Sequence, residues 1–231
     1  MDKKKKIIYE IIIISLCLLI VSGFLIVRSK IQTNKLKKEI HEVASLDLGK
    51  YKFNKELKCR GSYALVEEAI KTYLSDYTST LNDVNNIMND DKLVNMLSVN
   101  NYKEDAPEFT NSLEYLNSKE KEYTKKIDFL IKSSDSEYIN NYIYKYTKDR
   151  RFIKLYRDIL KEESIVDKTT KYKDDLISHK DDSLKVFKYS KDIINFLVIN
   201  KGKWKIDGNV IKFDNTSLLN AYNGALKAMG K

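Results

Sequence analysis

Residues 61–88, GSYALVEEAIKTYLSDYTSTLNDVNNIM, set the fold class of this chain. Apolar and aromatic residues recur in this stretch at steps of three and four, at Val66, Ile70, Tyr73, Tyr77, Leu81, Val84 and Met88. Such spacing places them along one face of an α-helix for about seven turns. The stretch therefore predicts a long amphipathic helix whose apolar face packs against other elements.

A second helix of similar length is expected downstream. Pro107 stands where a proline in the first turn of a helix belongs. The helical spacing then resumes at Phe109, Leu113, Leu116, Tyr123, Ile127 and Leu130. The connection contains Asn89-Asp90-Asp91, in which an aspartate is expected to cap a short turn near Leu93. Two long helices with a compact connection predict an antiparallel helical hairpin.

Further helices follow. Ser134 and Glu137 have the spacing of a capping box and predict a helix start in a tyrosine-rich stretch. The next apolar face is formed by Phe152, Tyr156, Ile159 and Leu160. Two more helices are expected near 168–178 and 183–198, and a last one is expected after a cap at Asn215 or Thr216.

In residues 204–213, WKIDGNVIKF, apolar and polar residues alternate with a period of two, which is typical of β-strands. Asp207-Gly208 is a typical turn dipeptide and predicts a β-hairpin. The predicted register sets Ile206 opposite Asn209 and Trp204 opposite Ile211. Trp204, Ile206, Ile211 and Phe213 then share one face, which is expected to pack on the helices because an isolated hairpin is marginal in water.

Composition agrees with a mainly α fold. Of 231 residues, 42% are hydrophobic and only seven are glycine and one proline. These values favour a helical protein with a real core over a loop-rich or all-β protein. The abundance of Lys, Ile, Asn and Tyr is typical of a bacterium with an AT-rich genome. We expect an elongated helical bundle with the C-terminal hairpin and terminal helix.

The N-terminal residues predict a membrane anchor. Ile7 to Val27 form an apolar run that would be about 32 Å long as a helix, close to the roughly 30 Å of a bilayer core. Fifteen of these residues are Ile, Leu, Val or Phe, which favours insertion by several kcal/mol. Glu10 lies one turn inside the boundary, where its side chain can reach the headgroups.

Two alternatives to a permanent anchor fit less well. A cleavable signal has a shorter apolar core and a small-x-small cleavage site, whereas this run ends in Leu25-Ile26-Val27-Arg28. A lipoprotein signal needs a small residue before the acylated cysteine, but Cys17 follows Leu16. The sequence therefore predicts an uncleaved single-pass signal-anchor.

The charge flanking the run decides the expected orientation. Lys3 to Lys6 favour a cytoplasmic N-terminus by the positive-inside rule. The opposite flank is also basic, with Arg28, Lys30, Lys35, Lys37 and Lys38, so the reverse orientation stays open. We expect a cytoplasmic tail of residues 1–6, an anchor of 7–27, a juxtamembrane stalk of 28–60 and an extracytoplasmic helical domain of 61–231.

The sequence contains no recognisable catalytic, cofactor-binding or metal-ligating motif. The chain has no glycine-rich phosphate loop and no G-x-S-x-G elbow. His41 and His179 lie in different segments, and Cys59 is the only cysteine outside the apolar run. We expect Cys59 to be a buried small residue, with a disulfide between two chains as the alternative. The acidic doublets are expected to be helix caps or solvated turns, and no catalytic residue, cofactor or metal is predicted.

One charged pattern stands out from the rest. Arg150, Lys154, Arg157 and Lys161 recur at i, i+4, i+7 and i+11 and predict a basic stripe on one helix face, opposite Phe152, Tyr156 and Ile159. It is either a solvated face or a contact for an anionic wall polymer, a lipid headgroup or an acidic partner. Residues 1–30 hold +4 of the +9 net charge. The remaining +5 is modest, so a nucleic-acid partner is not expected.

Three functions are compatible with these patterns. The first is a non-enzymatic, membrane-anchored helical domain that binds an unidentified ligand or partner outside the membrane. The second is a cell-envelope enzyme whose site is assembled from residues distant in sequence. The third is a structural subunit of a membrane complex. Expected partners are the lipid bilayer through Ile7–Val27, and another membrane or envelope protein or an anionic wall polymer. The oligomeric state is left open.

Overall fold

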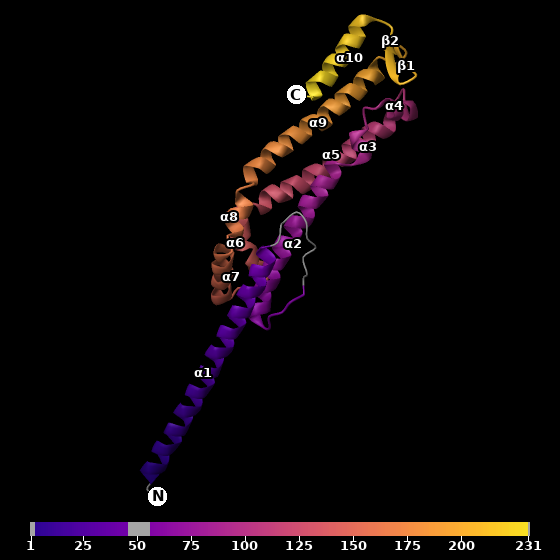
Figure 1. Ribbon diagram of the computed structural model, residues 1–231. Helices are drawn as coiled ribbons and strands as arrows, with labels where there is room; N and C mark the ends of the chain where they lie inside the picture. The colour runs from indigo at the N-terminus through magenta and orange to yellow at the C-terminus, as the bar shows by residue number, and fades with distance from the viewer. Residues whose placement is uncertain (1–2, 46–55, 231) are drawn as a thin grey trace. The chain divides into compact units, whose positions relative to one another are not determined.

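The computed structural model describes the backbone of residues 3–45 and 56–230, and the side chains of these residues from 22 onward except residue 25. The chain is mainly helical, with 78% helix and one small antiparallel hairpin near the C-terminus (Figure 1). The predicted mainly α class and the C-terminal hairpin are thus confirmed. The elements are α1 Lys3–Ala44, α2 Ser62–Met88, α3 Asp91–Val94, α4 Val99–Asp105, α5 Thr110–Ser133, α6 Ser136–Asn141, the 3₁₀-helix η1 Tyr142–Lys145, α7 Arg150–Glu162, α8 Ile165–Thr170, α9 Lys173–Ile199, β1 Trp204–Asp207, β2 Val210–Phe213 and α10 Thr216–Met229.

The chain divides into two compact units. Unit 1 comprises Met1–Ser75 and Asn140–Ile165, and unit 2 comprises Asp76–Ile139 and Val166–Lys231. Unit 1 thus combines α1, the first half of α2, η1 and α7. Unit 2 combines the second half of α2 with α3, α4, α5, α9, the hairpin and α10.

The core of unit 1 draws on helices far apart in the sequence. Its fully buried residues are Leu36 and Ile40 of α1, Val66, Ala69 and Ile70 of α2, Ile143 of η1, and Tyr156 and Leu160 of α7. The ring of Tyr73 meets that of Tyr142 edge-on, with centroids 5.6 Å apart. Two ion pairs join α1 to the end of α7: Lys37 Nζ lies 2.6 Å from Glu162, and His41 Nδ1 lies 2.9 Å from Glu163.

The last part of α1 contributes buried residues to this core from Leu36 onward, within the range 28–60 for which a stalk was expected. Leu36 and Ile40 are both 0% exposed. The loosely spaced apolar residues of this range continue helix α1, in which Leu36, Ile40 and Val43 are buried and Ile31 is 59% exposed. The expected interruption at residues 47–49 and the extended piece at 51–53 lie outside the described residues.

Among the residues that the structure describes, no helix has both the length and the apolarity needed to cross a membrane. The predicted span, Ile7–Val27, falls mostly on residues 7–21 and 25, whose side chains are outside the described part of the chain.

The core of unit 2 lies mainly between α5 and α9. Fully buried residues include Leu116, Tyr123, Ile127 and Leu130 of α5 and Phe187, Ile193, Ile194 and Leu197 of α9. α5 packs most extensively on α9, whereas a hairpin of the 62–88 and 106–130 helices was predicted. α2 meets α5 at fewer points, such as the ion pair of Asp83 and Lys126 at 2.7 Å. The single 27-residue α9 spans the end of the helix expected near 168–178 and all of the helix expected near 183–198.

α5 begins later than predicted. Pro107 lies three residues before the helix, after a cis peptide bond with Ala106, and Phe109 takes a left-handed conformation with φ of 53°. Asp105 caps the start of α5, because its carboxylate accepts hydrogen bonds from the backbone N–H groups of Asn111 and Ser112. The first-turn role predicted for Pro107 is therefore wrong.

The hairpin has a different register from the predicted one. Trp204 pairs with Phe213, Ile206 with Ile211 and Asp207 with Val210. The two turn residues are thus Gly208 and Asn209, and Gly208 has φ of +64°, as the first central position of a type II′ turn requires. The predicted set of residues still shares one face, because the register differs by two residues and side chains alternate with period two.

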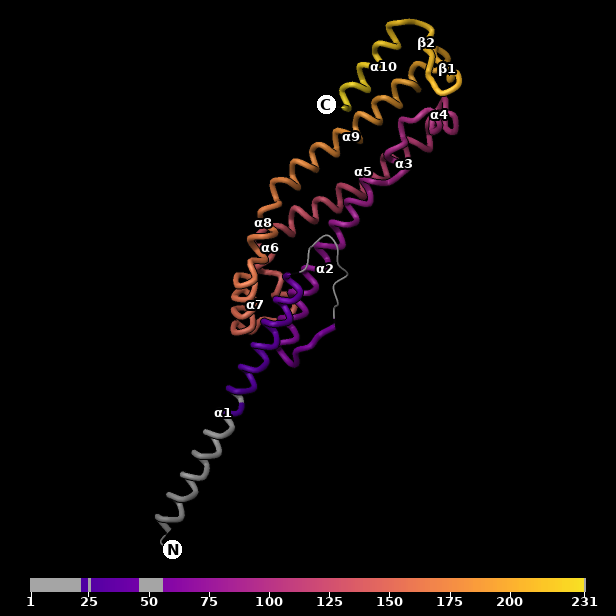
Figure 2. The backbone as a smooth tube through the Cα atoms, viewed as in Figure 1, coloured from indigo at the N-terminus to yellow at the C-terminus, as the bar shows by residue number. Residues whose placement is uncertain are grey.

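The buried face of the hairpin packs as expected. Trp204 Nε1 donates a 2.8 Å hydrogen bond to the carbonyl of Leu197, and the Phe213 ring lies 5.3 Å from that of Tyr222. Asn215 caps α10 by accepting from the N–H of Leu218, as predicted. Figure 2 shows α10 turning back along α9, with the hairpin at the bend.

Candidate functional site

The basic stripe occupies the outer face of α7. Asp149 caps this helix by accepting from the N–H of Arg151 at 2.9 Å. All four predicted stripe residues are exposed: Arg150, Lys154, Arg157 and Lys161. The opposite face buries Ile153, Tyr156, Ile159 and Leu160. Phe152, which was predicted on the buried face, is only half-buried, since its position lies at the edge of that face.

One stripe residue is held in place by its neighbours. Arg157 Nη2 lies 3.3 Å from both Asn141 Oδ1 and the hydroxyl of Tyr144. Tyr144 is 40% exposed, and its ring has Lys148 Nζ 5.1 Å and the Arg157 guanidinium 5.8 Å from its centroid. An exposed aromatic ring between two cations therefore borders the stripe.

Positive charge is concentrated in this part of the chain. Between residues 145 and 161 there are seven lysines and arginines and only two aspartates. Their net +5 equals the charge of all residues from 31 to 231. The surplus of positive charge is therefore local. The net charge of the whole chain had suggested that it is spread over the surface. A window of charge along the sequence would have found it.

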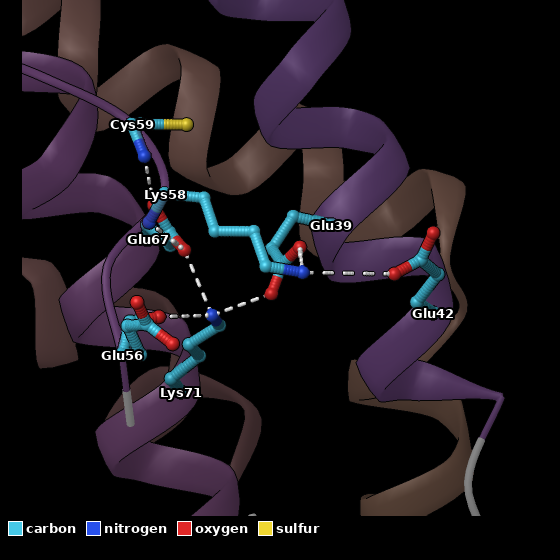
Figure 3. A network of polar contacts seen from close by, with 7 residues as sticks. All are labelled: Glu39, Glu42, Glu56, Lys58, Cys59, Glu67 and Lys71. Carbon is cyan, nitrogen blue, oxygen red and sulfur yellow. Dashed lines mark hydrogen bonds and ion pairs between the residues drawn. The ribbon is translucent and has the colours of Figure 1, made fainter. Parts of the chain in front are cut away.

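A buried ion cluster lies elsewhere in unit 1, and sequence reasoning missed it (Figure 3). The Lys71 ammonium lies 2.6 Å from Glu39 Oε1, 2.8 Å from Glu67 Oε1 and 2.7 Å from the carbonyl of Glu56. Lys58 Nζ lies 2.6 Å from the other oxygen of Glu39. Lys71 and Glu67 are 1% and 0% exposed. The cluster therefore joins α1, α2 and the segment before α2.

Glu67 also holds the backbone of that segment. Its carboxylate accepts the N–H of Lys58 at 3.0 Å and the N–H of Cys59 at 2.7 Å. Both donors precede α2, and the N–H of Cys59 would otherwise be buried without a partner. The visible sign in the sequence is the i, i+4 spacing of Glu67 and Lys71 beside the buried positions Val66 and Ile70.

The charges of the cluster stabilise one another. Burial alone would raise the pKa of Glu39, but hydrogen bonds and attraction from Lys58 and Lys71 bring it below its usual range. Burial would likewise raise the pKa of Glu67, but hydrogen bonds from backbone N–H groups and from Lys71 lower it below its usual value. The pKa of Lys71 is raised against the effect of burial, by its bonds to Glu39 and Glu67.

This arrangement suits a structural role for the cluster. The three N–H donors of a protonated lysine match the three acceptors around Lys71. An ammonium group with a raised pKa has no lone pair for nucleophilic attack or for general base catalysis. Glu39 and Glu67 are similarly occupied by Lys58, Lys71 and the backbone. The cluster thus fixes three segments together and leaves no group poised for proton transfer.

Cys59 is buried, as predicted, with 6% of its surface exposed. Burial and the adjacent Glu67 carboxylate raise the pKa of its thiol to about 12. Since the thiolate is the reactive form of cysteine, this thiol is unreactive at neutral pH.

The remaining candidate groups have local roles. His41 contacts Glu163, and Nδ1 of His179 lies 3.0 Å from the Tyr123 hydroxyl. Asp90 accepts from the N–H of Leu93 and caps α3, as predicted. Within residues 3–45 and 56–230, no group of three or more His, Cys, Asp or Glu side chains is arranged to hold a metal ion.

Comparison with known proteins adds no relative. No protein-family model matches the chain, and neither a curated protein nor a solved structure is similar to it.

Proposed function

We propose that this chain is a single-pass, membrane-anchored bacterial protein with a non-enzymatic extracytoplasmic binding domain. The anchor is Ile7–Val27, the six residues before it are cytoplasmic, and the C-terminal domain lies outside. The domain binds an anionic polymer or headgroup at the membrane surface through the basic stripe of α7.

The exposure of side chains along α1 carries this proposal. Phe24, Ile26 and Val27 are 58–68% exposed, although all are large and apolar. Two to three turns later the same helix is fully buried at Leu36 and Ile40. Contiguous exposed apolar residues mark a surface that another apolar phase or partner covers. Their position at the end of the apolar run of the sequence makes a lipid bilayer the best candidate.

The basic stripe supports a binding role. Its four cations are exposed on one helix face, and the surplus positive charge of the domain is concentrated around them. Clustered lysines and arginines attract anionic lipids and polymers, each contributing about 1 kcal/mol near a charged surface. The buried ion cluster, in contrast, is closed to a ligand because its charges neutralise one another.

Topology mapping tests this proposal. The full chain with a C-terminal tag should stay in the membrane at full length after alkaline carbonate extraction. External protease should remove the tag once the cell wall is digested, since the domain lies outside. A tag that stays protected would overturn the orientation. A shortened or carbonate-soluble product would overturn the anchor.

A further inference from the structure

A hollow of about 310 Å³ in unit 1 has three arginines in its lining. Arg28 comes from α1, Arg60 from the segment before α2, and Arg151 from the first turn of α7. We call it the arginine hollow. A second hollow of about 330 Å³ shares Arg151 and Phe152 with it and includes Lys154 of the basic stripe. Asp158 also lines this second hollow, which connects the arginine hollow to the basic stripe.

The walls of the arginine hollow are fixed by contacts between the elements. Ser29 Oγ and the Tyr63 hydroxyl share a hydrogen bond of 2.6 Å. The N–H of Arg60 donates to Gln32 Oε1 at 3.2 Å. The rings of Tyr63 and Phe152 meet edge-on with centroids 5.1 Å apart. The three arginines thus extend from a backbone frame in which α1, α2 and α7 are held together.

Much of the positive charge in the hollow is uncompensated. Arg151 pairs with Asp149, with Nη2 and Oδ2 2.8 Å apart. Neither Arg28 nor Arg60 has a carboxylate within ion-pair distance among the residues that the structure describes. An anion in the hollow would be attracted by both of these cationic side chains. The arrangement therefore favours a bound anion.

We propose that the arginine hollow binds the phosphate group of an anionic membrane lipid. Guanidinium groups donate two parallel hydrogen bonds to phosphate oxygens and are the preferred side chains for this anion. A cavity of this size also has room for a phosphate with its glycerol substituent. The neighbouring hydroxyls of Ser29 and Tyr63 are additional donors for it.

The choice of a lipid rests on the proposed anchor. Arg28 follows Val27, the last residue of the span, directly. At 1.5 Å per residue, Arg28 to Gln32 lie within about 8 Å of the span's end. The headgroup layer on each side of a bilayer core is about 5–8 Å thick. The α1 wall of the hollow is therefore at the level of the lipid phosphates.

Native mass spectrometry of the full chain in neutral detergent tests this proposal. The protein is titrated with phosphatidylglycerol and, separately, with phosphatidylcholine. We expect selective retention of phosphatidylglycerol. The double variant Arg28→Gln/Arg60→Gln should bind it more weakly by roughly tenfold for each guanidinium lost, the order of a charge-assisted hydrogen bond.

A matched control removes the same charge elsewhere. Lys188→Gln/Lys205→Gln changes two exposed lysines of unit 2 and should leave binding unchanged. Circular dichroism shows whether each variant is folded. Equal retention of both lipids by the original chain, or undiminished binding by the folded arginine variant, would overturn the proposal.

Soluble glycerol phosphate distinguishes the source of the phosphate. If it displaces the lipid at equal concentration, the hollow binds free phosphate esters and the lipid assignment is wrong. The anchor is judged separately by carbonate extraction of the same variant. The arginine variant should remain membrane-bound, so that loss of lipid binding and loss of the anchor are separate results.

Discussion

Lys71 is the most deeply buried lysine or arginine among the residues that the structure describes. Its side chain is 2% exposed, and its ammonium group lies between the carboxylates of Glu39 and Glu67. Attraction to two anions offsets the cost of removing all three charges from water. Removing the cation alone leaves two buried carboxylates facing each other, a change that costs much more than losing an exposed ion pair.

Lys71→Met should therefore destabilise the protein by about 3–5 kcal/mol. Lys37→Met is the control, because Lys37 and Glu162 form a half-exposed pair that contributes less than about 1 kcal/mol. Urea unfolding of the full chain in detergent, followed by circular dichroism, measures both. Similar losses for the two variants would contradict the idea that burial makes the Lys71 cluster important.

The same cluster predicts how stability depends on pH. Because the folded pKa values of Glu39 and Glu67 lie below the ordinary value of 4.5, the unfolded state takes up protons first as pH falls. Their contribution is complete above pH 4.5 and is lost as pH falls through the folded values. The raised pKa of Lys71 sets the limit at high pH. Its contribution to stability is complete below its ordinary pKa of 10.5 and is lost as pH rises through the higher folded value.

Unfolding free energies at pH 7, 4 and 3 provide the measurement. The original chain should lose stability more steeply below pH 4.5 than Glu67→Gln, which lacks one of the two coupled carboxylates. The variant should already be weaker at pH 7. Parallel curves for the two proteins would show that other carboxylates dominate acid unfolding.

The basic stripe lies on a single element, helix α7, and can be tested by reversing its charge. Reversal of its stripe, with glutamate at Arg150, Lys154, Arg157 and Lys161, replaces a cationic face by an anionic one. We expect the full chain in detergent to lose most of its binding to immobilised glycerol-phosphate polymer. The original binding should weaken with salt, since exposed charges are screened beyond about 8–10 Å at physiological ionic strength.

A reversal of equal size in unit 2 is the control. Lys121, Lys125, Lys188 and Lys205 are exposed lysines on α5, α9 and β1. Glutamate at these four positions changes the net charge by the same amount. If both reversals reduce polymer binding equally, only net charge matters, and the stripe is a solvated helix face.

Elements differ in how well the sequence predicted them. The start of α2 at Ser62 and its end at Met88 follow directly from helical periodicity. The start of α5 does not, because Asp105 caps it from five residues upstream. Local patterns specify a helix, whereas caps that reach across a turn depend on the folded backbone. The predicted hairpin register was wrong for a similar reason. The residues that flank the turn are compatible with Gly208 as its second central residue, as predicted, or as its first, as observed.

Packing partners of helices were less predictable than the helices themselves. The apolar face of α5 matches that of α2 in spacing, but α9 buries Phe187 and Leu197 against it. Any amphipathic helix can pair with several others, and the choice depends on long-range complementarity. The stripe on α7 was predictable because it needs only one helix. The ion cluster and the arginine hollow were not, because each joins three separate segments.

Attachment of the whole molecule to the membrane depends on the proposed anchor, Ile7–Val27. Its fifteen aliphatic and phenylalanine residues favour insertion by about 0.3–0.6 kcal/mol each. Arginine at the centre of a span costs about 2.5–3.5 kcal/mol. The double variant Ile14→Arg/Leu18→Arg should cancel most of the gain, so that carbonate extraction releases the protein.

Ser217→Arg/Asn220→Arg adds the same charge at exposed positions of α10. This variant should remain in the membrane fraction. Retention of both variants would point away from a lipid-spanning segment and toward attachment through another membrane protein.

Trp204 is the only tryptophan in the chain. Its ring stacks on Phe109 at 6.0 Å, and its indole N–H is bonded to the carbonyl of Leu197. All three residues belong to unit 2. Tryptophan fluorescence, excited at wavelengths that the tyrosines of both units do not absorb, therefore reports on that unit alone, while far-ultraviolet dichroism averages over both. The molecule thus has a natural optical label, with which the melting of one unit can be timed against that of the other without adding a dye.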